Sequence, residues 1–145
     1  MSVAVIKLFV LILAFIPLLI VNLRTGLVKN GMLGTTFAIG ALVAFFGPAF
    51  GAQPLKLFAL LGWGLTAGLL LGIAAYGSVS GGVAKLLIAL LPWFPFGEYL
   101  LAVTIGMLLA AAVAHWTGKN ALIVPPMMLA ALAVWLLPIL GFEPL

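Results

Sequence analysis

The sequence predicts an all-α fold, a polytopic membrane bundle of six transmembrane helices that forms a single transmembrane domain over residues 1–145. Of these residues, 67% are hydrophobic and only 6% are charged. Soluble domains carry about 25% charged residues, because a folded surface in water needs polar groups. The mean hydropathy is +1.46, and apolar stretches recur near the length of about 20 residues that crosses a bilayer. These observations indicate that most of the surface faces lipid.

Charged residues, glycines and prolines divide the chain into six apolar segments, each predicted to be a membrane helix: 3–21, 32–50, 55–75, 83–96, 99–116 and 121–140. The first segment has a basic start, as a secretory signal does. No small-residue cleavage site follows it, so we expect a permanent span. Pro17 in the first segment and Pro125–Pro126 in the sixth predict kinks whose freed carbonyls bond to neighbouring helices.

The third segment carries Gly64, Gly68 and Gly72 at four-residue spacing. Such a stripe lines one face of a helix with hydrogen atoms, which lets a neighbouring backbone approach closely. We therefore expect a helix-packing face, used either inside the chain or against a partner.

The fourth segment is the shortest and the least regular. Lys85 lies near its start, and Pro92 and Pro95 interrupt its far end. A tilted or partly re-entrant helix fits this pattern. Trp93 and Trp116 lie near the ends of their segments, where tryptophans commonly act as interfacial anchors.

The charged residues predict the orientation of the six segments. One set of loops and helix ends holds only cations: Arg24, Lys29, Lys85 and Lys119. The other set holds both signs: Lys7, Lys56, Glu98 and Glu143. The positive-inside rule assigns the first set to the cytoplasm. With six spans, both termini are then expected outside the cytoplasm.

The composition also excludes several classes of function. The absence of cysteine excludes disulfides, cysteine-ligated zinc, iron–sulfur clusters and thiol catalysis. His115 has only the distant acids Glu98 and Glu143, so we expect no metal and no cofactor. The cations are scattered singly and form no clustered basic face, so no nucleic-acid partner is expected. A pairing of Ser78 or Ser80 with His115 lacks a carboxylate to orient the histidine.

Two stretches at the predicted cytoplasmic helix ends carry recognisable motifs. The first, 22–30, reads Asn-Leu-Arg-Thr-Gly-Leu-Val-Lys-Asn, and the second, 76–87, ends in Gly-Gly-Val-Ala-Lys-Leu-Leu. Together they closely resemble the signature regions of the type IV prepilin peptidases, which are membrane aspartic proteases of the GxGD class. The family motifs read approximately Asp-Leu-Arg-Thr-x-x-Ile-Pro-Asn and Gly-x-Gly-Asp-x-Lys-Leu-Leu. The matching residues are Leu23, Arg24, Thr25 and Asn30 in the first and Gly82, Lys85, Leu86 and Leu87 in the second, with Gly81 beside them.

The resemblance covers the whole chain and implies a fold, a location and an activity. It implies the six-helix core of the family in its short form, without the amino-terminal domain that carries zinc-binding cysteines. It also implies a multi-pass protein of the bacterial inner membrane. The family activity is aspartic endopeptidase cleavage of pilin-like precursors at the cytoplasmic face.

The chain departs from the family at the two catalytic positions. Asn22 stands where the family has its first catalytic aspartate, and Val83 stands where it has the second. Aspartic proteolysis needs two carboxylates that share one proton, so that one activates water and the other polarises the scissile carbonyl. An amide cannot act as this base, and valine has no polar side-chain atom. The sequence therefore predicts no catalytic residue and an inactive homologue.

Two functions of different classes remain open. The leading hypothesis is a binding, scaffold or regulatory protein of the type IV pilus or protein secretion that holds a pilin-like transmembrane helix without cutting it. The alternative is a structural subunit of an unrelated membrane complex, with Gly64, Gly68 and Gly72 as its docking face. A transporter or channel has little support, because few polar groups lie within the predicted spans. In every case membrane lipid is an expected partner.

Overall fold

The computed structural model describes residues 3–26, 28–50, 56–77, 80–118, 123–137 and 140–141. Within these ranges the chain is helical and has no strand. The α-helices are α1 (Val3–Thr25), α2 (Asn30–Phe46), α3 (Leu57–Ala75), α4 (Gly81–Leu90), α5 (Phe96–Thr117) and α6 (Val124–Leu136). Two short 3₁₀ turns, η1 (Gly47–Phe50) and η2 (Leu91–Trp93), follow α2 and α4. The prediction of an all-helical fold with six helices is confirmed.

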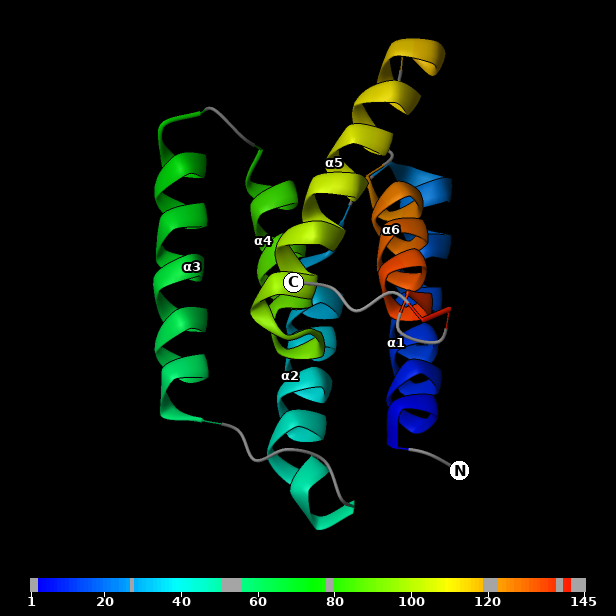
Figure 1. Ribbon diagram of the computed structural model, residues 1–145. Coiled ribbons are helices and arrows are strands. Elements are labelled where there is room, and N and C mark those ends of the chain that lie inside the picture. The colour runs from blue at the N-terminus through cyan, green and yellow to red at the C-terminus, as the bar shows by residue number, and fades with distance from the viewer. Residues whose placement is uncertain are drawn as a thin grey trace.

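The helices alternate in direction along the chain. In Figure 1, α1, α3 and α5 run one way and α2, α4 and α6 run the other, so the ends of α1, α3 and α5 lie at the same end of the bundle as the starts of α2, α4 and α6, and α5 projects farthest there. We call this the motif end, because it includes Asn22, Asn30 and Lys85. The opposite end includes Lys7 and Glu98. The described members of the two predicted charge sets therefore lie at opposite ends of the bundle.

Four helical segments are long and apolar enough to cross a membrane, judged by length and composition: Val5–Thr25, Asn30–Ala49, Leu57–Ala75 and Phe96–Thr117. Two are shorter, Gly81–Trp93 and Val124–Leu136. The segment predicted to be the weakest span, which contains α4, is one of the two. Pro92 lies in η2, and Pro95 lies immediately before α5, so the prolines separate α4 from α5.

The sixth helix begins differently from the prediction. Pro125 and Pro126 lie in the first turn of α6, where the missing N–H of proline costs no intrahelical hydrogen bond. The prediction that they kink the sixth span is therefore wrong. Pro17, by contrast, lies inside α1.

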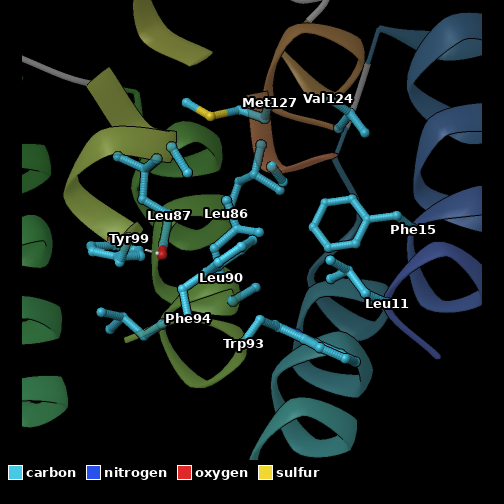
Figure 2. Packing of buried hydrophobic residues seen from close by; sticks show 14 of the residues in the cluster. Leu11, Phe15, Leu86, Leu87, Leu90, Trp93, Phe94, Tyr99, Val124 and Met127 are labelled. Carbon is cyan, nitrogen blue, oxygen red and sulfur yellow. Dashed lines mark hydrogen bonds between the residues drawn. The ribbon is translucent and has the colours of Figure 1, made fainter. Parts of the chain in front are cut away.

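The apolar core forms around α4 and the turn that follows it. Figure 2 shows Leu86 and Leu90 of α4 beside Phe15 of α1, with Trp93 below them. Trp93 is fully buried, and its indole Nε1 donates a hydrogen bond to the carbonyl oxygen of Thr36 at 3.3 Å. The prediction of an interfacial anchor at Trp93 is therefore wrong, whereas Trp116 is 87% exposed.

The helices are not equally enclosed. α5 and α6 pack most extensively against each other, α2 contacts both α1 and α4, and α3 packs mainly against α4. α3 lies at the edge of the bundle and has no buried residue. The fully buried core is thus formed by the other helices. α3 packs against it only through partly buried side chains such as Trp63, Ala67 and Leu70, while Leu65 and Leu69 are largely exposed.

Candidate functional site

The first motif lies on the last turn of α1. The buried side chains of this helix follow a helical stripe: Leu11, Phe15, Leu18 and Asn22. Asn22 is 0% exposed and is the one polar member of this stripe, while Leu23, Arg24 and Thr25 face outward. Asn22, the residue that the sequence resemblance predicts to stand at an aspartate position, therefore points into the bundle.

The side chain of Asn22 bonds to α6. Its Oδ1 accepts a hydrogen bond from the backbone N–H of Val124 at 3.3 Å. The first N–H groups of a helix have no partner within the helix, and the next two residues of α6 are prolines, which have no N–H. Asn22 therefore caps α6 from a residue 102 positions away in the sequence.

The second motif forms the start of α4. Ser80 precedes the helix, and its Oγ accepts a hydrogen bond from the N–H of Val83 at 3.3 Å. Gly81 and Gly82 form the first turn, and the half-buried Val83 packs against the apolar core. The hydroxyl of Ser80, one of the two candidate nucleophiles in the sequence, thus caps α4.

The two motifs meet through a side-chain hydrogen bond. Lys85 Nζ of α4 donates to Asn30 Oδ1, at the first residue of α2, over 3.1 Å. These residues are 55 positions apart in the sequence, and both side chains are exposed. Leu86 and Leu87, the last residues of the second motif, are buried and fix the orientation of α4 against the core.

The motif end has no described carboxylate. Glu98 is the one acid among the described residues, and it lies in the first turn of α5 at the opposite end. Glu143, Ser78 and Lys119 lie outside the described residues. The described ranges also contain no group of three or more histidine, cysteine or acidic residues that could hold a metal. The described side chains at this end can donate and accept hydrogen bonds, but they cannot share a proton as an aspartate pair does.

The glycine stripe has no packing partner within the described chain. A Cβ built at Gly64, Gly68 or Gly72 would meet no atom within 4 Å. The close helix approaches occur elsewhere. A Cβ at Gly40 would lie 2.6 Å from Trp93 Nε1, and one at Gly106 would meet Met127. Packing of the stripe against a partner stays a prediction.

Comparison with family models, with curated proteins and with solved structures finds no match to the chain. The features that bear on function are therefore the residues and contacts at the motif end. They comprise a buried amide, a core-packed valine and a hydrogen bond between the two motif segments.

Proposed function

We propose that this chain is a non-catalytic protein of the bacterial inner membrane, related to the type IV prepilin peptidases, that binds a pilin-like transmembrane helix without cleaving it. The hydrogen bond between Asn30 and Lys85 is the observation that carries the proposal. It joins the two segments that resemble the family motifs, although 55 residues separate them in the sequence. A chance resemblance of two short stretches would not require them to meet.

The same residues explain why the bound helix stays intact. Asn22 holds the start of α6, and Val83 contributes only apolar contacts. Neither position supplies the carboxylate that an aspartic peptidase needs to activate water. In this proposal the motif end faces the cytoplasm, in accord with the cations at that end, and both termini lie outside the cytoplasm.

A processing assay tests the lack of activity. The full chain, purified in mild detergent, is incubated with a pilin-type precursor, and the precursor is analysed by mass spectrometry. We expect the uncleaved mass. A cleaved precursor would overturn the proposal if a substitution elsewhere in the chain abolished the cleavage, because the catalytic group would then lie at that other position.

A pair of reversions tests the relation to the family. Asn22→Asp and Val83→Asp are made singly and together, and each variant is assayed with the same precursor. A single carboxylate has no partner with which to share a proton, so we expect no cleavage by either single variant. Cleavage by the double variant would support the relation, and a folded double variant that fails to retain the precursor would argue against a preserved binding groove.

The alternative is a structural subunit of another membrane complex. It is favoured by α3, whose 19 residues include no buried one and which carries the unpacked glycine stripe. The protein and its Gly68→Leu variant are purified in mild detergent, and the co-purifying proteins are identified. Pilus or secretion components that bind both forms favour the leading proposal. An unrelated assembly lost only from the variant favours the alternative.

A further inference from the structure

Lys85 is held by a neutral acceptor rather than by an acid. Its Nζ donates to the amide oxygen of Asn30 at 3.1 Å. An amide oxygen orients an ammonium group but does not neutralise it, because asparagine carries no charge. The hydrogen bond therefore fixes the position of a full positive charge beside the start of α2.

Other cations lie at the same end without a described counterion. Lys29 immediately precedes Asn30, and Arg24 lies in the last turn of α1. All three cationic side chains are exposed, and the one acid among the described residues, Glu98, lies at the opposite end. There, Lys7 Nζ lies over the ring of Trp135, 5.7 Å from its centroid. No described acid neutralises the charge at the motif end, so these cations are available to an anion from outside the described chain.

The position of these cations along the helices indicates which anion is within reach. The candidate span that contains α2 begins at Asn30, directly after Lys29. In a bilayer, Lys29 and the Asn30–Lys85 hydrogen bond would therefore lie at the membrane surface. The phosphates of anionic phospholipids lie at this level, and each nearby lysine or arginine strengthens their attraction about fivefold.

We propose that the motif end binds the phosphate of an anionic phospholipid beside the starts of α2 and α4, with Lys85, oriented by Asn30, as its principal contact. Lys29 and Arg24 add to the same positive field. This site is independent of any pilin-like partner, so its test does not depend on the function proposed above.

The test compares lipids and charge variants. The full chain in neutral detergent is titrated with phosphatidylglycerol or phosphatidylcholine, and binding is followed by native mass spectrometry and by the shift of the melting temperature. We expect saturable binding of phosphatidylglycerol and little shift with phosphatidylcholine. Lys85→Gln should weaken the binding about fivefold, and Lys56→Gln, which removes an exposed cation directly before α3, should leave it unchanged.

Asn30→Asp gives the sharpest comparison. This change keeps the shape of the side chain but supplies a carboxylate that neutralises Lys85, so phosphatidylglycerol binding should weaken at least as much as in Lys85→Gln. Circular dichroism checks that every variant keeps its helical content. Equal binding by the wild type, Lys85→Gln and Asn30→Asp would overturn the proposal. Stabilisation by inorganic phosphate or polyglutamate equal to that by phosphatidylglycerol would also overturn it, because the cations would then serve a soluble anion or an acidic protein.

Discussion

Replacing Asn22 by leucine should destabilise the protein although it adds apolar volume to an apolar bundle. The Asn22 side chain is 0% exposed, and its Oδ1 is the acceptor for the N–H of Val124 at 3.3 Å. Leucine has a similar size but no acceptor, so the N–H at the start of α6 would lose this bond in a site that is itself 0% exposed. An unsatisfied buried donor costs about 1–3 kcal/mol. We expect the free energy of unfolding to fall by that amount.

Thr36→Val is the matched control for Asn22→Leu. Asn22 and Thr36 are both polar and buried, but Thr36 Oγ1 donates to the Met32 carbonyl one turn earlier in its own helix. That carbonyl keeps its place in the helical hydrogen-bond ladder without the hydroxyl. Unfolding of both variants in mixed micelles, with helical circular dichroism as the signal, measures the difference. Equal stability of the two variants would refute the capping role of Asn22.

Two further substitutions test the close packing. Gly40→Ala should lower the free energy of unfolding by about 1–3 kcal/mol, because the new methyl group would lie 2.6 Å from the buried indole nitrogen of Trp93. In Gly68→Ala the new methyl group would meet no atom within 4 Å, so this change should raise helix stability by up to about 1 kcal/mol. The same unfolding titration measures both variants. Destabilisation by both would contradict the assigned packing. Tyr99→Phe should cost about 0.5–1.5 kcal/mol, because the buried Tyr99 hydroxyl donates to the Leu87 carbonyl at 2.9 Å. An unchanged stability would show that this hydrogen bond contributes nothing.

Hydropathy was sufficient to predict the six helices, because a long apolar run in a membrane protein has helix as its main structural option. It was less informative where helices start. Pro125 and Pro126 follow Val124 directly, and the structure shows that α6 begins at Val124, whose N–H bonds to Asn22. That partner lies 102 residues away, so no local pattern could indicate it.

Packing partners were the least predictable feature. The regular spacing of Gly64, Gly68 and Gly72 predicted a close helix contact, yet the close approaches among the described residues are at Gly40 and Gly106. Whether a glycine is needed depends on the side chain that faces it, and the sequence of one helix does not specify that neighbour. The position of Trp93 near the end of a predicted span indicated an interfacial anchor, but the sequence of that segment does not show that α2 covers the ring.

The most direct test of the relation to the peptidases is whether positions 22 and 83 face each other. The chain has no cysteine, so Asn22→Cys combined with Val83→Cys introduces the only two thiols. Leu23→Cys combined with Val83→Cys is the control, because Leu23 is exposed beside Asn22. If the two positions are those of a former aspartate pair, a short bifunctional thiol reagent should crosslink the 22–83 pair and not the 23–83 pair. A folded 22–83 variant whose two thiols each react with the reagent but are not joined by it would contradict the relation and, with it, the explanation for the predicted lack of cleavage.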